Sequence, residues 1–169
     1  MQKEDIAIGI DPGATGGSVA IVQKIGKVQV EKIIGTPTEG IIYAKETGAK
    51  VFLEKVHAFP GQGATGTFNF GMSYGLVFGA AEVLGVSLTL VSPQRWQAAI
   101  LERPEGRGTK EAALRFVERE WGLDGFTVGR ARKPHSGLID AACIAYWGLL
   151  YGDGYVEPAK VKKRKAIVF

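Results

Sequence analysis

The chain has few of the side chains on which redox and nucleophilic chemistry most often depend. Its 169 residues include one cysteine and two histidines. Cys143 has no second cysteine with which to form an intramolecular disulfide. It lies in the apolar run AACIAYWGLL, which favours a buried filler role over that of a catalytic thiol. The cysteine content therefore excludes a disulfide framework and fits a reducing compartment.

Long hydrophobic runs are also missing from the sequence. No stretch approaches the ~18 consecutive apolar residues of a membrane span. The first residues, MQKEDIAIGIDPG, carry acids and run directly into a strand pattern, unlike a signal peptide. We therefore expect a soluble, cytoplasmic protein with no membrane partner. A length of 169 residues with 46% hydrophobic content suits one core and is too short for two. We predict one domain over 1–152, followed by a basic tail over 153–169.

Positive charge is concentrated in a few places. The net charge is +4, but residues 158–169 hold five cations and no acid, so +4 − 5 leaves −1 for the rest of the chain. This tail is either a solvated terminus or a non-specific phosphate contact. Two further cationic clusters flank segments that we interpret as functional: Arg130, Arg132 and Lys133 in one, and Arg103, Arg107 and Lys110 in the other.

The order of hydrophobic patterns predicts an α/β fold. Three β-branched runs come first and read as an antiparallel meander, after which helices and strands alternate. Thr38 and Thr109 are the expected N-caps of their helices. The expected strands are 5–10, 18–23, 27–34, 51–54 and 87–91, and the expected helices are 38–48, 68–84, a short one opened by Ser92-Pro93, 109–121 and 136–150. This order indicates a mixed β-sheet flanked by helices.

Two acids end buried strands. Asp11 follows the apolar run from Ile6 to Ile10, and Glu54 follows Val51-Phe52-Leu53. Ligand sites of open α/β sheets lie at the carboxyl ends of strands. Taken singly, either acid could equally cap a helix or face solvent.

Asp140 is harder to explain as a surface acid, because it is the only charged residue between Leu138 and Leu150. We expect it in the first turn of its helix, where the helix dipole stabilises a carboxylate by about 1 kcal/mol at most. A helix that is apolar on every face is normally buried, and a buried carboxylate needs a cation, dense hydrogen bonding or a proton. If the strands ending at Asp11 and Glu54 are parallel neighbours and the last helix packs over their ends, the three carboxylates converge. Oxygen ligands of this kind suit Mg²⁺, with Mn²⁺ as a substitute.

The two histidines lie near these acids in sequence. His135 precedes the last helix and lies five residues before Asp140. It is either a metal ligand or proton carrier at the same site, or a surface loop residue. His57 follows Glu54 by three residues and is a weaker candidate for DNA contact.

Three elements together resemble the RuvC-like Holliday-junction resolvases, particularly the compact bacteriophage forms. They are Ile8-Gly9-Ile10-Asp11-Pro12-Gly13, Glu54 at a strand end, and Pro134-His135-Ser136-Gly137-Leu138-Ile139-Asp140-Ala141-Ala142, and the similarity in order covers about 5–150. The resemblance implies an RNase H-like fold and a homodimer that resolves four-way DNA junctions. It also implies two-metal-ion hydrolysis with Mg²⁺, by paired symmetric nicks and without a nucleotide cofactor. Such a protein is a crossover junction endodeoxyribonuclease.

The same resemblance assigns roles to individual residues. Asp11, Glu54 and Asp140 match the metal-binding acids of the family. The family usually has an Asp or His three or four residues before the last Asp, where this chain has Gly137 and Ser136, so His135 is the natural substitute. The residues matched to DNA contact are Phe59 as the base-stacking aromatic of the loop, and Lys110 and Arg107 as phosphate contacts, to which the cationic Arg132 and Lys133 are added. Phe68 and Phe70 compete with Phe59, but we expect them in the helix core, and Arg95 is a weaker phosphate candidate.

Three other functions remain open. A kinase of the actin-like superfamily could use the DPGATGG turn, but 169 residues leave no room for its second domain. A different RNase H-like nuclease, acting on RNA–DNA hybrids or flaps, would have a similar metal site. A junction-binding protein with a degenerate site would explain the missing fourth acid.

Overall fold

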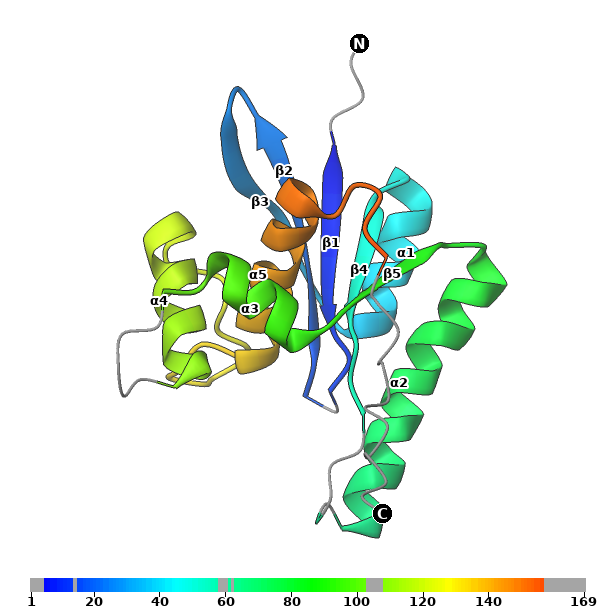
Figure 1. Ribbon diagram of the computed structural model, residues 1–169. Helices are drawn as coiled ribbons and strands as arrows, with labels where there is room; N and C mark the ends of the chain where they lie inside the picture. The colour runs from blue at the N-terminus through cyan, green and yellow to red at the C-terminus, as the bar shows by residue number, and fades with distance from the viewer. Residues whose placement is uncertain (1–4, 14, 58–60, 62, 103–107, 157–169) are drawn as a thin grey trace, which may run out of the picture.

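The computed structural model describes residues 5–13, 15–57, 61, 63–102 and 108–156 (Figure 1). Within this part of the chain, five strands and five helices follow one another in the α/β order that the sequence predicts. They are β1 (Ile6–Asp11), β2 (Gly17–Lys24), β3 (Lys27–Gly35), α1 (Pro37–Thr47), β4 (Lys50–Glu54), α2 (Ala64–Leu84), β5 (Leu88–Val91), α3 (Pro93–Ile100), α4 (Thr109–Trp121) and α5 (Ser136–Tyr151).

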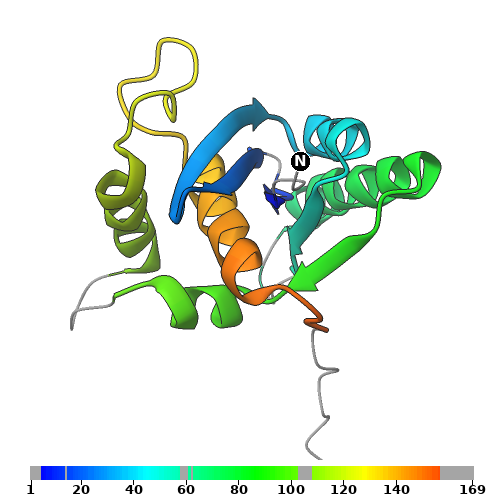
Figure 2. The same cartoon turned by 90° about the horizontal axis from the view of Figure 1, so that it is seen from above.

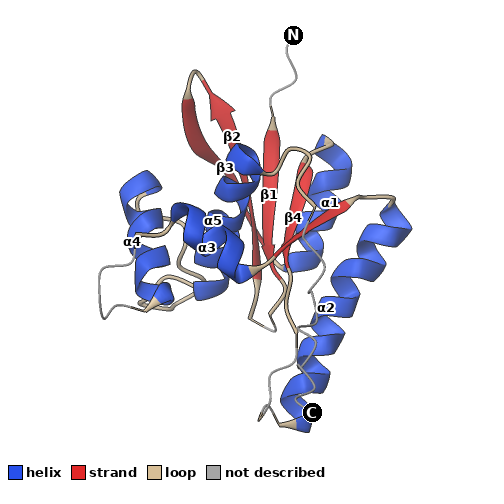
Figure 3. Ribbon diagram, in the orientation of Figure 1, coloured by secondary structure: helices blue, strands red, loops and turns tan. Residues whose placement is uncertain are grey.

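The strands form one mixed sheet in the order β3-β2-β1-β4-β5 (Figure 3). β1, β2 and β3 make an antiparallel meander, while β4 pairs parallel to β1 and β5 parallel to β4. The meander was predicted from the sequence, and the parallel pairing of β1 with β4 meets the condition that was set there for convergence of the three carboxylates. The meander places β3 at one edge of the sheet and β1 in the middle. β4 and β5, which alternate with helices along the chain, extend the sheet from β1 to the other edge.

Helices cover both faces of the sheet (Figure 2). α1 and α2 lie on one face, and α3, α4 and α5 lie on the other. Alternate residues of β1 serve the two sides: Ile8 and Ile10 join the core under α1 and α2, whereas Ala7 joins the core under α5. Gly9 also faces α5, and a Cβ there would collide with the backbone of Ala141 and Ala145. α5 therefore lies directly on the middle strand of the sheet.

Two predicted helix caps are wrong by one or two residues. α1 is capped by Thr36, not Thr38, and Thr36 and Glu39 form a reciprocal capping box in front of Pro37. α4 is capped by Gly108, and Thr109 is its first helical residue. In both cases a threonine near the helix start was mistaken for the cap itself.

α2 is longer and more exposed than predicted. It begins at Ala64 instead of 68, so the end of the expected loop is helical. Of its 21 residues only Val77 and Ala81 are buried. Phe68 is 66% exposed, which overturns its expected place in the helix core, and Phe70 is half-buried.

The chain after α5 stays against the domain as far as Tyr155. Tyr155 packs edge-on against Trp147, with ring centroids 4.9 Å apart, and Asp153 pairs with Lys50 at 2.7 Å. The cationic residues of the predicted tail lie outside the described residues. Cys143 is fully buried, as predicted. In the part of the chain that the structure describes, none of the helices combines the length and apolarity of a membrane span.

Candidate active site

Register and strand parity bring Asp11 and Glu54 to the same place. β1 pairs with β4 from Ala7 with Lys50 to Ile10 with Leu53, and the same offset sets Asp11 opposite Glu54. Phe52 belongs to the core under α5, and Glu54, two residues further on, faces the same side. The two acids therefore end neighbouring parallel strands on the face that α5 covers.

α5 brings the third acid to this edge. Its start is fixed by a parallel bridge between Gly16, in the turn after β1, and Gly137. Asp140 follows in the second turn of α5, although it was predicted in the first. Any stabilisation by the helix dipole is therefore weaker than expected there, because the effect is largest in the first turn.

The Asp11 carboxylate is held by the turn that follows it. The Gly13 backbone N–H donates to Asp11 Oδ1 at 3.0 Å. Burial raises the pKa of Asp11, opposed by this hydrogen bond and by the positive charges of His135 and Lys110. The same interactions show that the side chains of His135 and Lys110 lie near Asp11.

Glu54 and Asp140 have strongly raised pKa values. Burial raises the pKa of Glu54 to about 7, against a hydrogen bond from Trp96, and the negative charges of Asp11 and Asp140 add to the rise. Burial also raises the pKa of Asp140 to about 7, with a further contribution from Asp11 and an opposing one from Lys110. Each of the three acids thus lies close enough to repel another, as the convergence prediction requires.

The donor set of this cluster fits a hard divalent cation. Three crowded carboxylates in a buried setting repel one another, and Mg²⁺ or Mn²⁺ is the type of ion that such oxygen ligands take. The side chains are not gathered into a finished chelate, because no group of three or more His, Cys, Asp or Glu in the described part of the chain is drawn together tightly enough to hold a metal. The ligand chemistry is present, but closure around an ion requires side-chain movement.

His135 lies at the N-cap of α5 without capping it through its side chain. Its backbone N–H donates to the Phe126 carbonyl oxygen at 2.7 Å, which fixes the loop before the helix. Its Nδ1 is buried and has no hydrogen-bond partner. A buried imidazole nitrogen with no partner costs free energy, and a metal or an acidic neighbour would relieve that cost.

The predicted DNA-binding residues are divided between two loops and one helix start. Lys110 is exposed in the first turn of α4 and lines a small cavity of about 150 Å³ together with Asp140. Arg132 and Lys133 are exposed in the loop before His135. Phe59 and Arg107 lie outside the described residues.

Two weaker candidates of the sequence are also described. His57 is exposed, three residues after Glu54. Arg95 lies over the Tyr155 ring, with its guanidinium carbon 5.6 Å from the ring centroid. Among the candidates that the structure describes, Lys110 and His135 are those whose interaction with the carboxylates is shown.

Two residues near Glu54 were missed by the sequence reasoning. Trp96 donates its indole N–H to Glu54 Oε1 at 3.0 Å. Tyr74 of α2 forms a hydrogen bond with the Val56 backbone, and the negative charge of Glu54 adds to the rise that burial causes in its pKa. Trp96 could have been found, since a buried tryptophan in a helix that follows a sheet strand needs an acceptor for its N–H.

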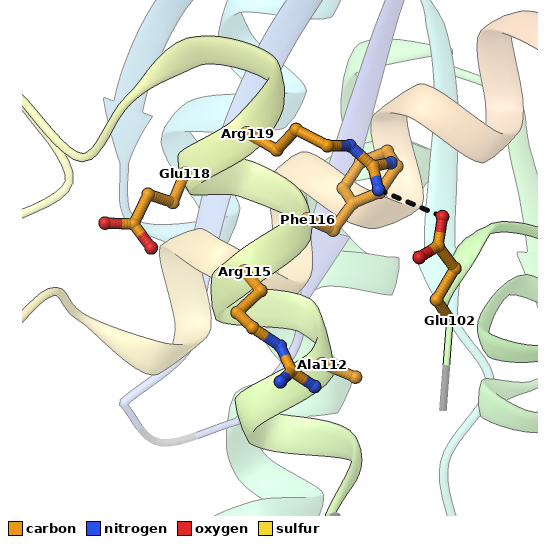
Figure 4. Close-up of a pocket in the computed structure, with 6 residues that line it drawn as sticks. All are labelled: Glu102, Ala112, Arg115, Phe116, Glu118 and Arg119. Atoms are coloured by element: carbon orange, nitrogen blue, oxygen red, sulfur yellow. Dashed lines mark hydrogen bonds and ion pairs between the residues drawn. The ribbon is translucent and has the colours of Figure 1, made fainter. Parts of the chain in front are cut away.

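A larger hollow of about 510 Å³ lies along α4, away from the carboxylates (Figure 4). Arg119 lies over the Phe116 ring and pairs with Glu102 at 3.1 Å. Arg115 pairs with Glu111 at 3.6 Å. The cations of this hollow have acidic partners, so it lacks the excess positive charge of a phosphate site.

The arrangement of sheet and helices defines an RNase H-like α/β fold. No family model matches the chain, and no curated protein matches its sequence. Solved structures do. RuvC of Thermus thermophilus in complex with a Holliday junction substrate aligns with a TM-score of 0.57 at 19% identity, over 89% of this chain and 96% of that one.

Two more solved structures of resolvases also align with the chain. A second structure of Thermus thermophilus RuvC aligns with a TM-score of 0.58 at 21% identity, over 88% of this chain and 96% of that one. The yeast mitochondrial Holliday junction resolvase Ydc2 aligns at 0.55 and 13% identity, over 82% and 75%. The chain therefore has the fold of the RuvC-like resolvases.

Proposed function

We propose that the protein is a metal-dependent nuclease that resolves four-way DNA junctions. The observation that carries this proposal is the edge at the carboxyl ends of β1 and β4 and the start of α5, where burial raises the pKa values of Glu54 and Asp140 and the nearby Asp11 raises both further. Two of the matched structures are described as Holliday-junction proteins, one of them with its junction substrate. The fold and the three acids thus both support metal-dependent cleavage of DNA.

The chain's own residues would divide the work as follows. Asp11, Glu54 and Asp140 hold Mg²⁺, with His135 as the fourth ligand through its unpartnered Nδ1. Bound Mg²⁺ would activate water and stabilise the leaving oxygen of a phosphodiester. Lys110, which already lowers the pKa of Asp140, supplies a positive charge beside the acids for a backbone phosphate.

DNA contact would extend from the acids to the neighbouring loops. Lys110 begins α4, where free backbone N–H groups favour phosphate. Arg132 and Lys133 add charge that steers DNA without reading its sequence. Phe59 belongs to the segment after Glu54, and we propose that it stacks on a base at the junction centre.

Paired nicks on a four-way junction require two copies of the site, and α2 offers a surface for a homodimer. The helix carries no charged residue from Ala64 to Ala81. Exposed apolar side chains on one face of it and on the adjoining part of α1 lie together: Ile42, Phe68, Met72, Leu76 and Val83. We call this set the α2 stripe. A twofold contact of this stripe with its copy would bury it without opposing like charges.

The test compares cleavage of a four-way junction, an RNA–DNA hybrid and a plain duplex in Mg²⁺ and Mn²⁺. We expect paired nicks in the junction, and loss of cleavage but retention of junction binding in Asp11→Asn, Glu54→Gln and Asp140→Asn. Glu46→Gln removes an exposed acid on α1 and serves as the control. Preferred cutting of the hybrid would favour another RNase H-like nuclease. Junction binding without nicking in either metal would favour a degenerate binding protein.

A further inference from the structure

The indole of Trp96 makes a direct hydrogen bond to one of the three acids. Its Nε1–H donates to Glu54 Oε1 at 3.0 Å, from α3 to the end of β4. Trp96 is 1% exposed, and its ring belongs to the core under α5. The donor is therefore held by packing on all sides, and it approaches Glu54 from the interior of the protein.

The backbone around this hydrogen bond is also fixed. Only Ser92 separates the end of β5 from the start of α3. Ser92 is the N-cap of the helix, and Pro93 is its first residue. The Lys55 backbone N–H donates to the Val91 carbonyl oxygen at 2.7 Å, which ties the residue after Glu54 to the end of β5. The strand that carries the acid and the helix that carries the donor thus share one anchor.

We propose that Trp96 is a positioning residue that presents Glu54 to a divalent cation. The indole N–H takes one acceptor site of Oε1 and fixes the plane of the carboxylate, so the remaining acceptor sites would face a metal in one orientation. A lysine in the same place would bring a positive charge that competes with the cation. An indole N–H is neutral and can only donate, so it orients the carboxylate without neutralising it. This assignment rests on the proposed metal-dependent function.

The chain contains a matched control for this contact. Trp121 of α4 donates its indole N–H to the Val28 backbone carbonyl oxygen, also at 3.0 Å. Its acceptor is on β3, which is separated from β4 and Glu54 by two strands of the sheet. Trp96→Phe and Trp121→Phe therefore delete the same kind of hydrogen bond and the same ring nitrogen, but only the first touches an acid of the cluster.

The experiment measures metal binding and cleavage separately. The full-length wild type and both variants are titrated with Mn²⁺ while the thermal unfolding midpoint is followed, and junction cleavage is measured against Mg²⁺ concentration. Trp96→Phe should need about tenfold more of either metal, as expected for loss of a partner of a ligand. Trp121→Phe should keep the wild-type metal requirement. Equal metal requirements in the two variants would overturn the proposal, even if the wild type cuts junctions.

A second measurement on the wild type guards against a Trp96→Phe variant that does not fold. The indole N–H resonances of Trp96 and Trp121 are followed by NMR during a Mg²⁺ titration, and again in Glu54→Gln. The Trp96 resonance should move with Mg²⁺ and with the substitution, while that of Trp121 stays in place. A Trp96 resonance that responds to neither would refute the positioning role. A wild type that responds to neither metal in any assay would refute the proposed function as well.

Discussion

Gly137 forms a parallel bridge with Gly16, and the contact leaves no space for a side chain at position 137. A Cβ there would lie 2.9 Å from the carbonyl carbon of Gly16 and closer still to the carbonyl oxygen of Thr15. The resemblance to the resolvases puts the family's usual fourth metal ligand at position 136 or 137. In this chain position 137 is used for backbone packing and has no space for that side chain.

Restoring an acid at position 137 should therefore damage the protein. Gly137→Asp forces the turn after β1 away from α5, and we expect a loss of about 2 kcal/mol or more in the free energy of unfolding. Ser136→Asp places the same carboxylate on the exposed neighbouring residue and should change stability by about 0.5 kcal/mol or less. Urea unfolding of both variants checks this. If Gly137→Asp is as stable as Ser136→Asp, the turn after β1 can move to make room for a side chain, and the prediction is wrong.

Because position 137 has no space for a side chain, we propose His135 as the fourth metal ligand. His135→Ala removes the buried, unpartnered Nδ1, and we expect at least about tenfold weaker Mn²⁺ binding with little loss of folding stability. His57→Ala, on an exposed residue, should leave Mn²⁺ binding unchanged. Calorimetric titration of metal into each variant makes the comparison. Unaltered Mn²⁺ affinity in His135→Ala would return this histidine to the surface-loop interpretation.

Most of the fold could be predicted because its buried strands and its last helix are marked by clear apolar runs. The three acids lie at the ends of these runs. The apolar runs before Asp11 and Glu54 mark buried strands, whereas the parallel pairing of these strands was only a condition for convergence of the acids. The apolar sequence after Asp140 likewise marked a buried helix. These predictions concern backbone placement, for which hydrophobic periodicity is a direct signal.

The remainder could not be read from periodicity, because it depends on contacts between distant segments. The bridge of Gly16 with Gly137 joins two glycine-containing turns whose spacing in sequence carries no sign of their pairing. The hydrogen bond from Trp96 to Glu54 depends on where α3 starts relative to the carboxyl end of β4, which the sequence pattern does not specify. Phe68 was expected in the core because an apolar helix usually packs one face inward, and α2 instead leaves most of its surface exposed.

The raised pKa values of Glu54 and Asp140 predict how stability depends on pH in the absence of metal. Both are about 7 in the folded protein, against usual values of 4.5 and 3.8. The folded state therefore holds protons that the unfolded state has lost between these values. Stability should fall as the pH rises from about 4 to about 7 and then level off, since above about 7 both states are ionised.

Urea unfolding in EDTA across this range measures that dependence. Asp140→Asn should flatten the slope and stabilise the metal-free protein near pH 8, because a buried negative charge is removed. Saturating Mn²⁺ should stabilise the wild type more than the variant at that pH. A wild type whose stability rises steadily with pH over the same interval would contradict the crowding of these acids.

The α2 stripe predicts the oligomeric state. Leu76 is 62% exposed at the middle of the stripe, on a helix that offers no opposite charge within the stripe itself. Leu76→Glu would place two carboxylates at a twofold contact and should convert a dimer into monomers, with loss of paired nicking but retained secondary structure. Ile25→Glu, at the fully exposed tip of the β2–β3 hairpin, makes the same chemical change away from α2. Sedimentation at several concentrations distinguishes the two. If Leu76→Glu remains dimeric while Ile25→Glu dissociates, the contact between copies lies at the hairpin and not on α2.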